Sequence, residues 1–128
     1  AERRLASPIA AALPGRSWNA CGESDLMQLA ALLKCCTLFV GNDSGPGHLA
    51  AALGTPVVTL MSAIHAPGIW EPRGAEALVL RETVPCEFCR GETFCRTGTE
   101  ICVRGITVAR VVAAARALLT SGRRAHSS

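Results

Sequence analysis

The segment from Leu38 to Leu60 constrains the fold of this chain more than any other stretch. It contains a short apolar run, a polar loop, a helical stretch that ends at Gly54, and a second apolar run. Two short strands joined by a helix favour parallel pairing through a right-handed crossover, because parallel strands need a long connection. The segment predicts a buried strand, a helix and a second strand, over 37–40, 46–53 and 56–60.

The flanking sequence extends this alternation of helices and strands. Apolar residues at helical spacing predict further helices over 2–13, 25–36 and 108–119. Ser24 is the expected N-cap of the second of these helices. Short apolar runs predict two more strands, over 17–21 and 78–80. The fold class is therefore α/β, a Rossmann-like domain with a parallel sheet in which the strand over 38–40 lies centrally.

The length of 128 residues is enough for one compact domain with its own core. We expect that domain over 1–120, including a cysteine-rich segment over 84–104. The polar residues over 121–128 are expected to form a disordered tail.

Charge and composition exclude several classes of function. The net charge is only +3 and the basic residues are scattered, while aromatic residues make up 4% of the chain. A nucleic-acid partner would need a concentrated basic face with stacking aromatics, so none is expected. No apolar run approaches the length of a membrane span, and no signal peptide is visible. Seven cysteines, an odd number, then favour a reducing, cytoplasmic location.

The loop 42–45 is the candidate ligand site. In an open parallel sheet, ligands bind beyond the carboxyl ends of the strands, where this loop must lie. The helix that starts at Pro46 would present unpaired N–H groups and its positive dipole end, which together bind anions. Gly45 and Gly47 would let the backbone approach a phosphate, and Ser44 would add a hydroxyl donor.

Two further polar residues, Asp43 and His48, flank this expected phosphate site. Asp43 is either the N-cap of the helix or a functional carboxylate. In the second case it should face sugar hydroxyls or a protein N–H, because a carboxylate beside a phosphate would cost affinity. His48 lies in the first helical turn, where a neutral imidazole could donate one hydrogen bond to a ligand.

The residues from Asn42 to Pro56 resemble the signature of glycosyltransferase family 9, the lipopolysaccharide core heptosyltransferases. That signature reads roughly D-(S/T)-G-P-x-H-L-A-A-A-L-G-x-P. Upstream, residues 22–26 (GESDL) are similar to the family's G-(K/R)-x-S-L loop. Downstream, Trp70-Glu71-Pro72 and the cysteines that end at Cys102 are similar to its closing region. The resemblance covers nearly the whole chain.

The resemblance implies the C-terminal half of a two-domain GT-B enzyme that transfers a sugar with inversion and without a metal or other cofactor. Asp43 would contact the donor sugar, and Ser44 and Gly45 would cradle the diphosphate of ADP-heptose or a related ADP-sugar. Pro46 and His48 would lie beside them, and the loop of Glu23 and Ser24 would border the adenosine. The catalytic base and the site for a lipid A-core type acceptor would belong to an N-terminal domain that lies before Ala1. Such an enzyme would work in the cytoplasm, with a peripheral position at the inner face of the inner membrane possible.

The chain departs from the family pattern at two places. Glu23 replaces the usual basic residue beside the donor, and residues 61–64 (MSAI) replace the common F-G-x-T. Both changes leave the identity of the transferred sugar open. Two other functions remain as alternatives, a non-catalytic nucleotide-sugar or metal-binding module and a sugar-nucleotide epimerase-like domain. The epimerase is disfavoured because acidic residues typically stand where this chain has Pro46 and His48.

The cysteine-rich segment has the spacing C-x2-C-x5-C-x6-C at Cys86, Cys89, Cys95 and Cys102. Thiolates at such spacing suit Zn²⁺ or an iron–sulfur cluster, and the alternative is a compact loop of buried thiols. No metal is favoured over another. The other three thiols, of Cys21, Cys35 and Cys36, are expected in the core.

Overall fold

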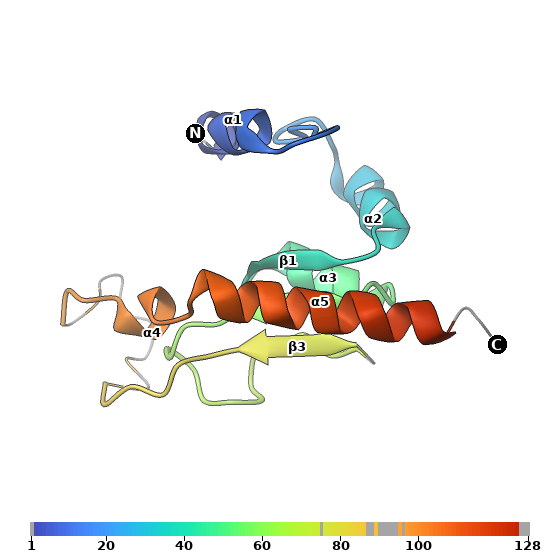
Figure 1. Cartoon of the computed structure of the whole chain (residues 1–128). Helices are drawn as coiled ribbons and strands as arrows, with labels where there is room; N and C mark the ends of the chain where they lie inside the picture. The colour runs from blue at the N-terminus through green and yellow to red at the C-terminus, as the bar shows by residue number, and fades with distance from the viewer. Residues whose placement is uncertain (1, 75, 87–88, 90–94, 96, 126–128) are drawn as a thin grey trace.

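The computed structural model describes residues 2–74, 76–86, 89, 95 and 97–125 (Figure 1). Five helices and three strands occur in this part of the chain. In order they are α1 (Glu2–Ala12), α2 (Leu26–Cys35), β1 (Phe39–Asn42), α3 (Gly45–Ala52), β2 (Val57–Leu60), β3 (Ala77–Leu80), α4 (Ile101–Arg104) and α5 (Val108–Ala125).

The three described strands form one parallel sheet in the order β1-β2-β3. This confirms the predicted α/β class and the parallel pairing. The predicted central position of the first strand is wrong, because β2 lies between β1 and β3. Val57 and Val58 of β2 are fully buried, whereas Val40 of β1 is 45% exposed at the edge of the sheet. Burial of the side chains on both faces therefore marks β2 as the central strand.

The strand predicted over 17–21 does not form. Its polar side chains bond to α1 instead of lying on a sheet. The Ser17 hydroxyl donates to the Ala10 carbonyl at 2.8 Å, and the Asn19 side-chain amide donates to the Arg3 carbonyl at 3.2 Å. These contacts explain why α1, which forms where it was predicted, is followed by an irregular segment.

Helices cover both faces of the sheet. Residues of α2 and α3 pack with β2 in one apolar cluster of Leu33, Ala50, Ala51 and Val57. Helix α5 contacts β2 and β3, and Figure 1 shows it running alongside the sheet. The Thr55 hydroxyl donates to the Leu33 carbonyl at 2.7 Å, which ties the loop between α3 and β2 to α2. The sheet is therefore the middle of three layers.

Helix α3 ends where the sequence predicted. Gly54 has a φ of +83°, the left-handed conformation that follows many helix ends and that glycine adopts without strain. Its N–H donates to the Ala51 carbonyl at 3.1 Å. The glycine thus turns the chain into β2.

The start of α2 differs from the prediction. The N-cap of α2 is Asp25 and not Ser24, because the Asp25 carboxylate accepts from the Gln28 amide N–H at 2.8 Å. The Gln28 side chain in turn accepts from the Asp25 N–H at 3.0 Å, which completes a capping box.

Helix α5 continues to Ala125, past position 119 where the sequence predicted its end. The Thr120 and Ser121 hydroxyls donate to carbonyls of the preceding turn, at 2.8 and 2.9 Å, so these residues do not end the helix. Residues 126–128 of the predicted tail lie outside the described residues. Within the described part of the chain, no helix combines the length and the apolarity needed to cross a membrane.

Replacing Asp25 with alanine is expected to lower the free energy of unfolding by about 1 kcal/mol, because the Gln28 amide N–H at the start of α2 loses its acceptor. Ser24→Ala is the matched control and should leave the free energy nearly unchanged. Urea unfolding of both variants measures the difference. Equal losses would contradict the capping box.

Candidate anion site at the carboxyl edge of the sheet

The site begins where β1 leaves the sheet. The Asp43 N–H donates to the Leu60 carbonyl at 3.1 Å, which extends the pairing of β1 with β2 by one residue. The next residue, Ser44, is the N-cap of α3, and its carbonyl accepts from the N–H groups of Gly47 and His48 at 3.0 and 3.3 Å. The N-terminus of α3 therefore lies at the carboxyl edge of the sheet, as the sequence predicted.

The Ser44 side chain does not cap α3. Its hydroxyl donates to the Asn42 carbonyl at 3.1 Å, and no side-chain cap hydrogen bond exists. Among the described residues, the amide groups of Ser44 and Gly45 have no hydrogen-bond acceptor. Pro46 in the first turn has no N–H to satisfy. The first turn thus keeps free donors at the positive end of the helix, which suits an anion.

Asp43 and His48 face each other across this turn. The Asp43 carboxylate lies 3.5 Å from His48 Nε2, with 33% and 38% of the two side chains exposed. The alternative that Asp43 is the N-cap of α3 is wrong, because Ser44 occupies that position. At this exposure both side chains are open to contact with a ligand.

The two glycines expected to approach a phosphate have different surroundings. A Cβ at Gly45 would meet no atom within 4 Å, so the backbone there is open. A Cβ at Gly47 would come within 3.3 Å of the Phe39 ring and 3.7 Å of the Thr59 hydroxyl. Gly47 is buried and lets α3 approach the sheet, while Gly45 alone is open toward a ligand.

Glu23 and Ser24 lie in another surface feature. One Glu23 oxygen pairs with Arg3, and the other accepts from the Trp18 indole N–H at 3.0 Å. Both residues line an open hollow of about 450 Å³ together with Trp18, Gln28, Ala31, Leu32 and Cys35. None of the residues at the start of α3 lines this hollow. The structure groups Asp43 with Ser44, Gly45, Pro46 and His48, and Glu23 with Ser24, as two separate sets.

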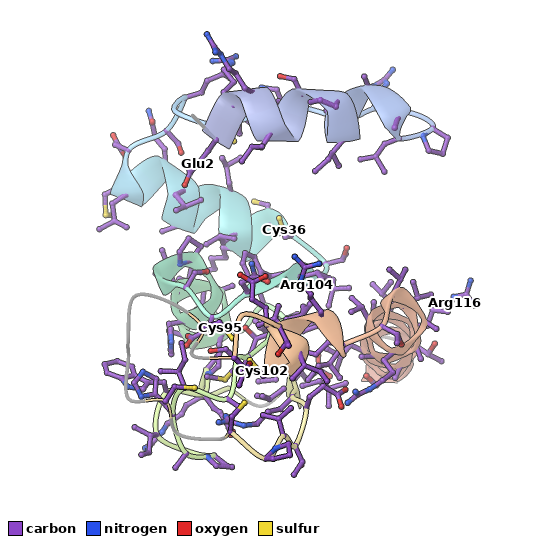
Figure 2. All side chains as sticks on the ribbon, turned by 90° about the vertical axis from the view of Figure 1, so that its left-hand side faces the viewer. Glu2, Cys36, Cys95, Cys102, Arg104 and Arg116 are labelled. Carbon is purple, nitrogen blue, oxygen red and sulfur yellow. The ribbon has the colours of Figure 1, made fainter. Side chains whose placement is uncertain are left out.

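The cysteines do not form a metal centre in the described part of the chain. There, no group of three or more His, Cys, Asp or Glu side chains is placed to hold a metal ion. The Cys89 thiol donates to the Cys86 carbonyl at 3.3 Å, and the Cys95 sulfur accepts from the Glu100 N–H at 3.3 Å. Cys102 is part of α4, and Cys95 lies near the start of this helix (Figure 2). Most residues between Cys86 and Cys95 lie outside the described residues.

The prediction of a core position for the other thiols is wrong for Cys35 and Cys36, which are exposed, and Cys21 is partly buried. Only Leu33 of α2 is buried, so the end of this helix turns its thiols away from the core.

Cys95 has an unusually acidic thiol. A hydrogen bond from the Thr97 hydroxyl and the backbone N–H of Glu100 lower the pKa of Cys95 from 9.0 to about 7. Hydrogen bonds to sulfur stabilise the thiolate, which is the nucleophilic form. The sequence offered no signal for this, because the effect depends on the turn that follows the cysteine.

The described residues define an α/β protein of the Rossmann-like kind, with a parallel sheet between helical layers and a free helix N-terminus at its carboxyl edge. The chain belongs to glycosyltransferase family 9 (heptosyltransferase), whose family model matches residues 1–98. This confirms the resemblance found in the sequence.

Several curated proteins are similar to parts of the chain. Lipopolysaccharide heptosyltransferase 3 of Escherichia coli is 48% identical over 42 residues, which are 33% of this chain and 12% of that protein. The lipopolysaccharide core heptosyltransferase OpsX of Haemophilus influenzae is 45% identical over 49 residues, or 38% of this chain and 14% of that protein. Lipopolysaccharide heptosyltransferase 2 of Salmonella typhimurium is 40% identical over 63 residues, or 49% of this chain and 18% of that protein.

The matched stretches thus span less than a fifth of the length of these relatives. No solved structure matches the chain at a significant level.

Gly47→Ala is expected to lower the free energy of unfolding by about 1–3 kcal/mol, because the added methyl group would press on the Phe39 ring. Gly45→Ala adds the same group in open space and should not destabilise the fold. Thermal unfolding of the two variants gives the comparison. A greater loss at Gly45 would refute the assignment of Gly47 to packing.

Alkylation of Cys95 by iodoacetamide is expected to reach half its maximal rate near pH 7, since the thiol is protonated and slow below its pKa and ionised above it. Peptide mass spectrometry isolates Cys95 from the other six cysteines. Thr97→Val should move the midpoint to higher pH, because the largest stabilising hydrogen bond is lost. An unchanged midpoint in that variant would exclude Thr97 as the cause.

Proposed function

We propose that this chain is the donor-binding, C-terminal half of a GT-B heptosyltransferase, which binds ADP-heptose or a related nucleotide sugar. The proposal is carried by one observation. The amide groups of Ser44 and Gly45, at the start of α3, have no hydrogen-bond acceptor among the described residues and are free for a ligand. Membership of glycosyltransferase family 9 supports a nucleotide sugar as the ligand that accepts hydrogen bonds from these amides.

In this proposal the diphosphate meets the amides of Ser44 and Gly45, beside Pro46. The open space at Gly45 supports a close approach of phosphate oxygens to the backbone. The helix end and its amides supply part of the positive potential, and the proposal includes no metal or other cofactor.

The donor sugar then lies against Asp43 and His48. A carboxylate accepts hydrogen bonds from sugar hydroxyls, and the His48 imidazole, 3.5 Å away, can contact the same sugar. This arrangement supports Asp43 as a contact of the sugar and not of the diphosphate.

The hollow beside α2 is the candidate site for the adenosine. Trp18 and Leu32 supply apolar surface there, and Glu23 and Ser24 supply polar atoms. A purine with a ribose needs this combination of a flat apolar contact and a few hydrogen-bonding groups. The proposal therefore assigns Glu23 and Ser24 to the nucleoside end of the donor.

The longer enzyme would carry its catalytic base and its lipid A-core type acceptor site on the other domain. The transfer would proceed with inversion at the anomeric carbon. We further propose a cytoplasmic location, with peripheral contact at the inner face of the inner membrane, where such an acceptor is exposed.

Isothermal titration of the chain with ADP-heptose and with ADP tests the proposal. Both should bind, and Asp43→Asn should weaken ADP-heptose by about tenfold without weakening ADP, because the contact that is lost is made to the sugar. Glu100→Gln removes an exposed carboxylate that pairs with Arg104 on α4, and serves as the control. An equal loss for both ligands would remove Asp43 from the sugar site.

The chain alone should show no heptosyl transfer, because the proposed base and acceptor site belong to the other domain. Heptosyl transfer by residues 1–128 alone would refute the assignment of the base and the acceptor site to the other domain. Binding of ADP-heptose without any transfer by the longer protein would instead identify a non-catalytic binding module.

A further inference from the structure

Arg81 has a buried guanidinium group without a hydrogen-bond partner. Its Nε, Nη1 and Nη2 atoms are all inaccessible to solvent, and none has a partner among the described residues. Burying a charge is costly unless an opposite charge and hydrogen bonds compensate for it. An anion with hydrogen-bond acceptors at this position would compensate for the buried charge.

The strand register places Arg81 at the same edge as the start of α3. Leu60 pairs with Leu80, and the pairing continues one residue further, since the Met61 N–H donates to the Leu80 carbonyl at 2.9 Å. The Asp43 N–H donates to the Leu60 carbonyl in the same way. Asp43, Met61 and Arg81 thus form one row across the carboxyl edge, with neighbouring strands about 4.8 Å apart.

The alternation of side chains places Arg81 on the α3 face. Along β2, Val57 packs with Ala50 and Ala51 of α3, so residues two and four positions later lie on the same face. Met61 is one of them, and side chains in one row of a parallel sheet share a face. Asp43, in the same row, contacts His48 of α3.

The neighbouring residue supports this direction. Glu82 pairs with Arg110 of α5, on the opposite face of the sheet. Arg110 also donates to the Arg81 carbonyl at 3.2 Å, which fixes the backbone between the two side chains. The side chains of Arg81 and Glu82 therefore lie on opposite faces of the sheet, and Arg110 pairs with Glu82.

Charge balance also calls for a cation at this edge. A helix N-terminus contributes about half a positive charge, whereas a diphosphate carries at least two negative charges and Asp43 adds another. An arginine offers a planar pair of donors that fits phosphate oxygens.

We propose that Arg81 is a further phosphate-binding residue of this site, pairing with the anion whose other oxygens meet the amides at the start of α3. The inference rests on the proposed nucleotide-sugar function and adds to it the residue that neutralises the diphosphate. It also predicts that the phosphates extend from α3 across Met61 toward β3.

The test compares Arg81→Gln, Arg81→Lys and wild-type chains in titrations with ADP, inorganic pyrophosphate and adenosine. Arg81→Gln should weaken ADP and pyrophosphate by roughly 10- to 100-fold, the loss of a charge-assisted bidentate contact, and leave adenosine unchanged. Arg81→Lys should recover part of that loss, because it restores the charge without the planar fork. The control is Arg116→Gln, which removes an exposed arginine on α5 (Figure 2) and should change none of the three affinities.

Thermal unfolding separates this role from a structural one. Without ligand, Arg81→Gln should melt at or above the wild-type temperature, and the rise that ADP produces should be reduced. A lower melting temperature with an unchanged ADP affinity would overturn the proposal, because it would assign Arg81 to an ion pair within the chain. If wild type binds pyrophosphate through Arg81 but not ADP, the nucleotide-sugar function fails and the anion site stands. If the wild-type chain binds neither pyrophosphate nor ADP, both the nucleotide-sugar function and the phosphate-binding role of Arg81 are refuted.

Discussion

The contact between α3 and the sheet depends on side chains no larger than a methyl group. Gly47, Ala50 and Ala51 are buried there, and a single added carbon at Gly47 would press on the Phe39 ring. Because α3 lies close to the strands, its first turn begins directly after the end of β1. The position of the free amides therefore follows from the packing, and any change that lifts α3 from the sheet would move the site as well.

The parts of the fold that were predictable are those that local sequence determines. The run Val57–Leu60 has three apolar residues out of four and predicts a buried strand, and Gly54 marks the end of α3. The failures occurred where a local pattern had two physical solutions. Ser17 and Asn19 suited a strand but found acceptors on α1, and Ser24 suited a cap that Asp25 makes together with Gln28.

The candidate site also contains residues that the sequence predicts and one that it does not. Asp43, Ser44, Gly45 and His48 are neighbours in the sequence, so a reading of one loop was enough to group them. Arg81 is 38 positions beyond Asp43 in the sequence and joins the site only through the register of three strands. Register and face depend on pairing partners, which a single sequence does not specify. The acidity of Cys95 was hidden for a similar reason, because it depends on one turn closing onto the sulfur.

The hydrogen bond from the Ser44 hydroxyl to the Asn42 carbonyl has a consequence for the speed of binding. In many helices the hydroxyl of an N-cap serine accepts from the amide two or three residues further on, and that bond has to break before an anion can use the amide. Here no side-chain capping bond has to break when a ligand arrives. Association at α3 should therefore proceed close to the rate of encounter, with little energy spent on rearrangement, so that differences in affinity among ligands appear mainly in their rates of release.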